Sequence, residues 1–229
     1  MFRRLRFLGI TLAIVGLLFV AAGGYAYLKA QEGYRSLNAF SAAQDVSLSY
    51  NDQGVLVDRG EPAGAQAIMA LLTDEWEYPV VAGELDPNDP LVNTPSEYMY
   101  QMATIAYHTL HGTQTIVLTE DKEYKGEVFP AGEYQFAVDG RYFSQFDRSH
   151  PIEGAARDKA WSGTAHALIA NLGVGTVTGS ALQLGLGLAA LFAGVGALAL
   201  LSGLGLVWAV RPERETVAEL QLRPKPIPA

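Results

Sequence analysis

The stretch GLGLAALFAGVGALALLSGLG, residues 185–205, decides the fold predicted for this chain. Its six glycines interrupt a run of alanine, leucine, valine and phenylalanine, and no Asp, Glu, Lys or Arg occurs between residues 160 and 210. About 20 consecutive apolar helical residues cross a hydrocarbon core of roughly 30 Å. Residues 184–210 are therefore predicted to form a transmembrane helix.

A second apolar stretch, FLGITLAIVGLLFVAAGGYAYL, covers residues 7–28 and carries no charge. The basic residues before it and the small residues in FVAAGG are also typical of a signal peptide. The apolar run nevertheless continues to Tyr25 and Tyr27, which suit an interfacial aromatic anchor. We therefore expect an uncleaved first transmembrane helix.

Charge is distributed unevenly along the 229 residues and predicts the orientation in the membrane. The two tails, residues 1–6 and 211–229, hold 7 basic and 3 acidic residues, whereas residues 29–180 hold 9 basic and 21 acidic ones, a net charge of −12. Positive charge near the ends of spans favours the cytoplasm. Both termini are therefore expected on the cytoplasmic side of the plasma membrane, with residues 29–180 on the extracytoplasmic side. Such an acidic domain repels nucleic acid.

The region between the spans is predicted to be an inserted extracytoplasmic α+β domain. The first helix should continue outward through KAQEGYRSLNAFSAAQ, and VSLSYNDQGVLVD reads as a hairpin around NDQG. Helices are expected over EPAGAQAIMALLTDEW, TPSEYMYQMATIAYHTLHG and the segment from SHPIEG onward, and strands over TIVLTE, EYKGEVF, EYQFAV and RYFSQF. The chain has no cysteine, so neither disulfides nor thiolate chemistry are available.

Small residues fall on particular helix faces and predict helix packing. At 100° per residue, the second span carries two opposite glycine faces, and the first span repeats glycine every seven residues. Small residues allow close backbone approach in membranes. One face of the second span is expected to pack on the first span and the other on a different chain or copy. The first-span glycines are Gly9, Gly16 and Gly23; the second-span faces are Gly185, Gly196 and Gly203, and Gly187, Gly194 and Gly205.

Glycine could instead indicate a nucleotide site, through NLGVGTVTG with Gly173, Gly175 and Gly179. This pattern is one residue away from the dinucleotide fingerprint, which also needs an acidic residue about 20 positions later. The following 30 residues contain no acid, and no lysine is placed for a phosphate loop. Nucleotide binding is therefore not predicted.

Histidine gives the only candidate metal ligands. The segment YHTLHG places His108 and His111 at i and i+3 on one helix, where they could bind zinc or copper with a third ligand from His150, His166 or an acid. No spacing identifies that ligand. The alternative is a solvated polar face that also contains Glu97, Gln101 and Thr104.

Hydrolytic chemistry has no recognisable motif. Ser149 is next to His150, and Ser162 is close to His166, but neither pair belongs to a nucleophile motif such as G-x-S-x-G. Neither span contains a charged residue, which argues against a transport path through this chain alone. We expect no enzymatic activity and no resident cofactor.

The segment DGRYFSQFDRSHPIEGAARDKAWSGTAHALIANLGVGTVTGSALQLGLGLA resembles a group of uncharacterised two-span integral membrane proteins of high-GC Gram-positive (actinobacterial) bacteria. Some of these proteins carry an automatic label as aromatic ring-opening dioxygenases. The YHTLHG pair alone does not supply the two histidines and a carboxylate that such an iron site needs. The resemblance implies a cell-envelope location and transfers no functional residue.

The function expected from the sequence is that of a non-catalytic accessory subunit in a membrane protein complex. Its spans would pack on other integral membrane subunits within the bilayer, and its outer domain would cover the external face. Two alternatives remain, an exported metal- or ligand-binding domain anchored by the spans, and a homo-oligomeric envelope scaffold.

Overall fold

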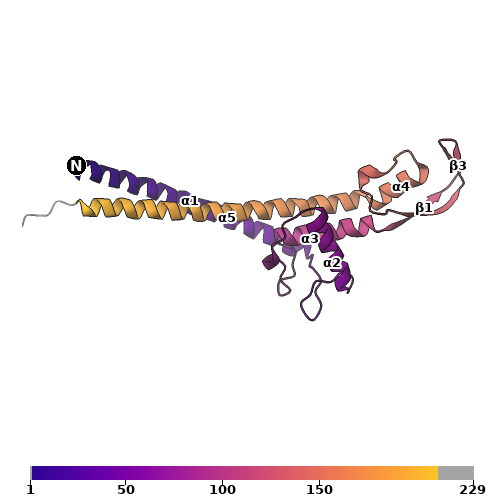
Figure 1. Cartoon of the computed structure of the whole chain (residues 1–229), viewed down its shortest axis with the longest axis horizontal. Helices are drawn as coiled ribbons and strands as arrows, with labels where there is room; N and C mark the ends of the chain where they lie inside the picture. Colours follow the sequence, from indigo (N-terminus) through magenta and orange to yellow (C-terminus); the bar gives the residue numbers. More distant parts are fainter. Residues whose placement is uncertain (1, 211–229) are drawn as a thin grey trace, which may run out of the picture. The chain divides into compact units, whose positions relative to one another are not determined.

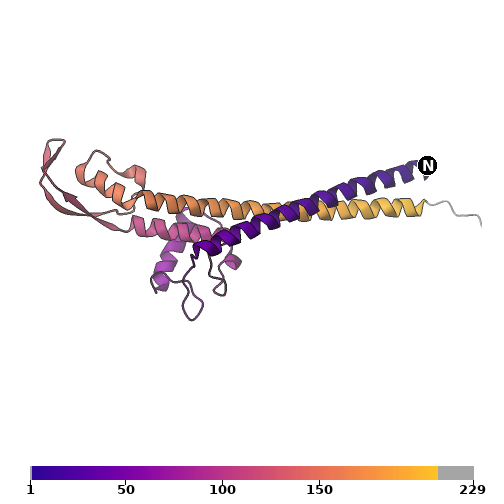
Figure 2. The ribbon, with the colours of Figure 1, turned by 180° about the vertical axis from the view of Figure 1, so that it is seen from behind.

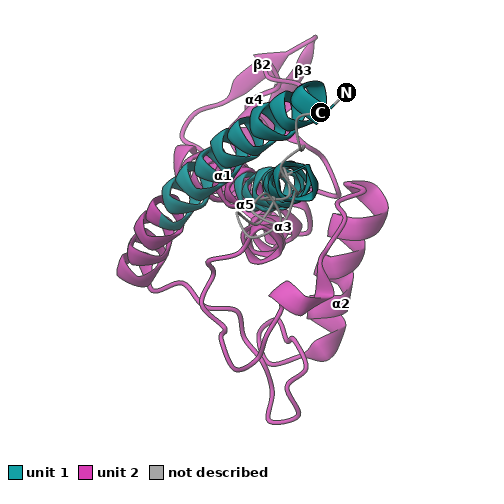
Figure 3. Ribbon diagram, turned by 90° about the vertical axis from the view of Figure 1, so that its left-hand side faces the viewer, with its two compact units in different colours: residues 1–31, 184–229 teal, residues 32–183 magenta. Residues whose placement is uncertain are grey.

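The computed structural model describes residues 2–210, and the expected cytoplasmic tail, residues 211–229, lies outside the described residues. The chain divides into two compact units, shown in Figure 3. The first contains residues 2–31 and 184–210 of the described part, and the second contains residues 32–183.

Two long helices, α1 (Phe2–Gln44) and α5 (Gly163–Ala209), form the first unit and contribute their remaining residues to the second. Both are long and apolar enough to cross a membrane, and only 11% of the most apolar window of each is buried. A core helix of a soluble protein would be mostly buried instead. Two long apolar helices with a small α+β region between them agree with the predicted fold class and are compatible with a membrane location.

Within the first unit the two helices are antiparallel and in contact along their length (Figures 1 and 2). Gly9 meets Gly203, Gly16 meets Gly196, and Gly23 meets Ala189. An edge-to-face contact between Phe19 and Phe192, with ring centroids 5.7 Å apart, adds to this seam.

The second unit begins within α1, which continues beyond its apolar residues to Gln44; the predicted continuation of this helix is confirmed. The NDQG turn forms as expected, with an antiparallel bridge between Tyr50 and Leu56. The next helix is α2 (Pro62–Ala70), which continues as a π-helical turn η1 (Leu71–Glu75), and a short 3₁₀ turn η2 (Ala82–Glu84) follows.

Helix α3 (Pro95–Leu110) confirms the helix predicted over TPSEYMYQMATIAYHTLHG. Thr94 and Glu97 form a reciprocal capping box, and Pro95 occupies the first turn, where a missing backbone N–H costs nothing. The predicted solvated face is wrong at Glu97, whose side chain is buried because it satisfies the backbone at the helix N-terminus.

The strands form two antiparallel pairs, β1 (Thr113–Leu118) with β4 (Gly132–Ala137), and β2 (Lys122–Tyr124) with β3 (Glu127–Phe129). The single strand expected over EYKGEVF is therefore wrong. Lys125 and Gly126 both have positive φ, at 49° and 83°, and form a two-residue turn that splits it into β2 and β3. RYFSQF is not a strand either, because it contains the 3₁₀ turn η3 (Phe143–Gln145).

Three apolar clusters hold the second unit together. One joins α2 and α3 around Ile68 and Leu72, and another surrounds Trp161 and Val138. The third places Ile116 and Leu118 of β1 against α4 (Pro151–Ala160). The two sheets therefore depend on helix α4 for a buried face, because two-stranded ribbons are marginally stable alone.

Candidate functional site

The glycine seam between α1 and α5 is too tight for any larger side chain. A Cβ atom on Gly16 would lie 2.4 Å from the Leu200 nitrogen and 2.6 Å from the Gly196 oxygen, and one on Gly203 would lie 2.5 Å from the Gly9 oxygen. These atoms belong to backbone and cannot rotate away. Gly185 is looser, since its Cβ would meet only the Ala30 side chain at 3.8 Å.

The opposite face of α5 has no partner among residues 2–210. A Cβ atom added at Gly187, Gly194 or Gly205 would meet no atom of the described chain within 4 Å. Apolar side chains border this face, including Leu184, Leu191 and Leu198, which are 65%, 57% and 69% exposed. We call Gly187, Gly194 and Gly205, with these three leucines, the open face.

The glycines of NLGVGTVTG have a packing role in the second unit. A Cβ on Gly175 would lie 2.6 Å from the Tyr98 ring, and one on Gly179 would lie 2.9 Å from Pro95. Gly173 has open space around it. Two of the three glycines thus let the start of α3 contact α5 closely, which gives the pattern a structural explanation without a nucleotide.

Tyr98 also connects α3 to α1. Its hydroxyl lies 2.6 Å from Ser41 Oγ, and both groups are buried. Ser41 donates its single hydroxyl proton to the Leu37 carbonyl at 3.0 Å, so Tyr98 is the donor in the pair. One aromatic side chain therefore fixes three helices of the second unit.

Two carboxylates accept hydrogen bonds from backbone N–H groups at the N-terminus of α3. Glu97 Oε2 accepts hydrogen bonds from the backbone of Asn93 and Thr94 and from the Thr94 hydroxyl, at 2.8–3.0 Å. Burial nevertheless raises the pKa of Glu97, because desolvation of the carboxylate outweighs these bonds. Glu84 accepts from the Ser96 backbone at 2.9 Å and from Gln183 of α5.

Two neighbouring tyrosines lack hydrogen bonds. The hydroxyls of Tyr50 and Tyr100 are buried and have no partner in the part of the chain that the structure describes. Burial raises the pKa of Tyr100 to about 12, with a further contribution from the negative charge of Asp58. A buried hydroxyl without a hydrogen bond lowers the free energy of unfolding, so the Tyr100 hydroxyl is expected to destabilise the fold.

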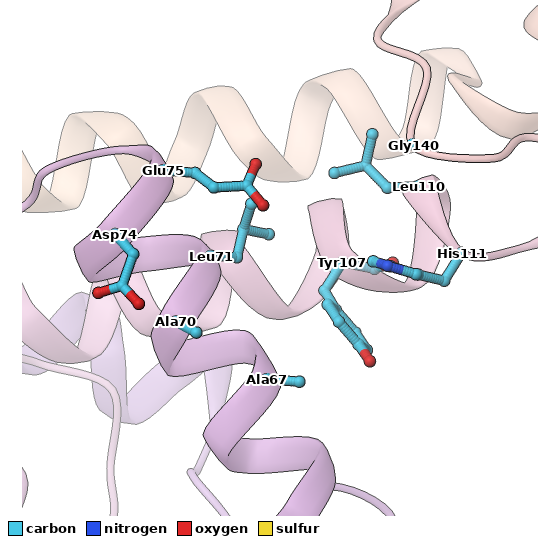
Figure 4. A pocket seen from close by; sticks show the side chains of 9 residues that line it. All are labelled: Ala67, Ala70, Leu71, Asp74, Glu75, Tyr107, Leu110, His111 and Gly140. Carbon is cyan, nitrogen blue, oxygen red and sulfur yellow. The ribbon is translucent and has the colours of Figure 1, made fainter.

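The structure separates the two candidate metal ligands. His108 Nε2 lies 2.9 Å from Asp58 Oδ1, whereas His111 contacts the Tyr107 carbonyl through Nδ1 at 2.9 Å. His111 lines a pocket of about 390 Å³, and Figure 4 shows Glu75 of η1 on one side of it and Tyr107 and His111 on the other. Within residues 2–210, no group of three or more His, Asp or Glu side chains is placed to hold a metal ion.

The other two histidines act on helix starts. His150 caps α4, since its Nδ1 accepts from the backbone of Ile152 and Glu153 at 3.2 Å. His166 contacts the Ser162 carbonyl, not its hydroxyl, and Ser162 Oγ accepts from the Ala165 backbone. Neither neighbouring serine is thus paired with a histidine in the way that nucleophilic catalysis requires.

Two further cavities lie in the second unit, and α3 contributes to the lining of both. The first, about 560 Å³, is lined mainly by aromatic and methionine side chains, among them Trp76, Met102, Tyr142 and Trp161. The second, about 300 Å³, lies among α1, α3 and α5. We call this second one the three-helix cavity; sequence patterns did not reveal it, because its walls come from three distant segments.

No protein-family model, curated protein or solved structure matches this chain.

Proposed function

We propose that this chain is a non-catalytic accessory subunit of a bacterial membrane protein complex, inserted through α1 and α5. The open face of α5 would bind a helix of another subunit. The observation that carries the proposal is the contrast between the two glycine faces. Gly196 and Gly203 are covered by α1, whereas Gly187, Gly194 and Gly205 have nothing within 4 Å among the described residues.

Physical reasons favour a protein partner over lipid on the open face. Helices in membranes associate through close packing, which small residues permit, since the surrounding lipid is as apolar as leucine. A glycine in a helix interior costs roughly 0.5–1 kcal/mol relative to alanine. Three glycines on a face that met only lipid would lower helix stability without any compensating contact.

The orientation is part of the same proposal. Arg3, Arg4 and Arg6 precede the first apolar stretch, and the intervening residues 29–180 are strongly acidic. We propose that both termini are cytoplasmic and that the second unit lies outside, where it would cover the external face of the complex. No reaction is assigned, because His150 and Ser162 act as helix caps and neither belongs to a serine–histidine hydrogen bond between side chains.

Extraction in mild detergent, followed by mass spectrometry of co-purifying chains, tests the proposal. The variant Gly187→Leu/Gly194→Leu should lose the partner while it remains inserted. Gly24→Leu is the matched control, since Gly24 also has nothing within 4 Å but lies on α1. If the double variant and the control retain the same partners, the open face is not the binding surface.

A photo-crosslinking residue at Leu191 of the open face separates the alternatives. Cross-links to another integral membrane chain support the accessory subunit. Cross-links only between copies of this chain support the homo-oligomeric scaffold, and cross-links only to lipid contradict both.

A further inference from the structure

The three-helix cavity has apolar walls and a partly exposed mouth. Its apolar lining comes from the outer part of α1, the segment before α3, α3 itself and the first part of α5, namely Phe40, Val46, Val92, Ile105, Leu168 and Leu172. Phe40 and Leu168 are 53% and 46% exposed, although both are large and apolar. A volume of about 300 Å³ is at the lower end of the range of small-molecule sites.

The polar lining is neutral. Among the residues that the structure describes, no Asp, Glu, Lys, Arg or His lines the cavity, and the Tyr98 hydroxyl is already bonded to Ser41. The side chains of Gln44, Gln101 and Asn171 also line it; Gln44 and Asn171 are exposed and Gln101 is half-buried. Three carboxamides, which both donate and accept, are thus available at an apolar cavity.

We propose that the three-helix cavity binds an uncharged amphiphile, with a hydrocarbon chain against the apolar walls and a neutral hydroxyl, ester or carbonyl group against the three carboxamides. A charged head group would meet no opposite charge among the lining residues, and any part of it removed from water would carry a desolvation cost. A neutral oxygen would exchange its bonds to water for bonds to amides. The site does not depend on the open face or on the accessory role.

The source that the chain favours is membrane lipid. Phe40 belongs to the same helix as the apolar residues 7–28, and Leu168 and Leu172 belong to the same helix as residues 184–210. Neutral lipid of the membrane that these two helices are proposed to span is therefore the first source to test, a step that rests on the proposed insertion. A free amphiphile taken up from the aqueous phase has the same chemistry and is the second source to be tested.

Photolabelling of the full-length protein in nanodiscs tests the site. The probe is a long-chain alcohol that carries a diazirine, and labelled peptides are identified by mass spectrometry. We expect labelling of α3 and the first part of α5 that is reduced at least about tenfold by Ile105→Trp, which fills the cavity. Val117→Trp, on an exposed strand position, is the control and should label normally.

Two comparisons probe the polar wall. The corresponding fatty acid, ionised at pH 8, should compete at least about tenfold more weakly than the alcohol, since its charge is unpaired in the cavity. Gln101→Leu should weaken competition by the alcohol severalfold, whereas Gln53→Leu, in an exposed turn, should not. Equal competition by alcohol and fatty acid would refute a neutral-head site.

Analysis of the lipid that co-purifies with the protein identifies the source of the amphiphile. Neutral lipid that co-purifies with wild type, and is depleted in Ile105→Trp, identifies the bilayer as the source; probe labelling without such lipid identifies an aqueous ligand. Labelling that is unchanged in Ile105→Trp, or cavity positions that cross-link only to another polypeptide, would overturn the proposal.

Discussion

Replacement of single glycines by alanine tests the seam between α1 and α5 most directly. At Gly16 the new Cβ would be 2.4 Å from the Leu200 nitrogen, against an ordinary contact distance of 3.4–4 Å. The helices must therefore separate by about 1 Å at this level. A gap of that size forfeits about a quarter to a half of each dispersion contact.

The expected cost follows from these distances. Overpacking of a close contact destabilises by about 1–3 kcal/mol, so Gly16→Ala should weaken the helix pair by that amount. Gly194→Ala meets no atom within 4 Å. It should be neutral or gain up to about 1 kcal/mol from helix propensity. The same glycine-to-alanine change is therefore expected to destabilise the helix pair at Gly16 and not at Gly194.

Energy transfer between two dyes measures the separation of the helices. Because the chain has no cysteine, Phe7→Cys and Trp208→Cys give two unique labelling sites, at positions 73% and 71% exposed on the two helices. In a titration with a denaturing detergent, Gly16→Ala should lose half of its energy transfer at a lower detergent concentration than wild type. Gly194→Ala should not. Equal midpoints, or a larger loss at Gly194, would refute the seam.

Three other outcomes are expected. In intact cells, an impermeant maleimide should label a cysteine at Asp52 and should label one at Arg4 only after permeabilisation; the reverse would invert the proposed topology. In chemical denaturation, Tyr98→Phe should cost about 1 kcal/mol through the lost bond to α1, whereas Tyr100→Phe, which removes an unpaired hydroxyl, should be neutral or stabilising; equal losses would contradict these contacts. Because the folded-state pKa of Glu97 is raised, its contribution to stability is present at low pH and is lost as pH rises through that pKa. Glu97→Gln should remove this loss when unfolding midpoints are measured from pH 4 to 8. Parallel plots of midpoint against pH for wild type and Glu97→Gln would show that Glu97 does not titrate as inferred.

Regular elements with local signals were predictable from sequence. The capping residue Thr94, the proline after it and the apolar spacing locate α3, and the two uncharged runs locate α1 and α5. These features depend on neighbours within a few residues. The turn at Lys125–Gly126 carried a weaker signal, because lysine with positive φ is uncommon there.

Features assembled from distant segments were not predictable in the same way. Gly23 lies opposite Ala189, and Gly185 makes only a loose contact with Ala30. Both facts depend on the register between the two helices, which a helical wheel of either helix alone does not give. Glu97 looked solvated by periodicity but is buried by its capping role. The three-helix cavity combines residues 40–46, 92–105 and 168–172, so it exists only after folding.

The two glycine faces of α5 also predict how sequence variation should be correlated. Gly196 and Gly203 face backbone of the same polypeptide, so changes there should be compensated within this gene. Gly187 and Gly194 face nothing in the described chain. If they contact another subunit, their compensating changes should appear in a different gene, and comparison of paired genomes would then identify the partner without any biochemical purification.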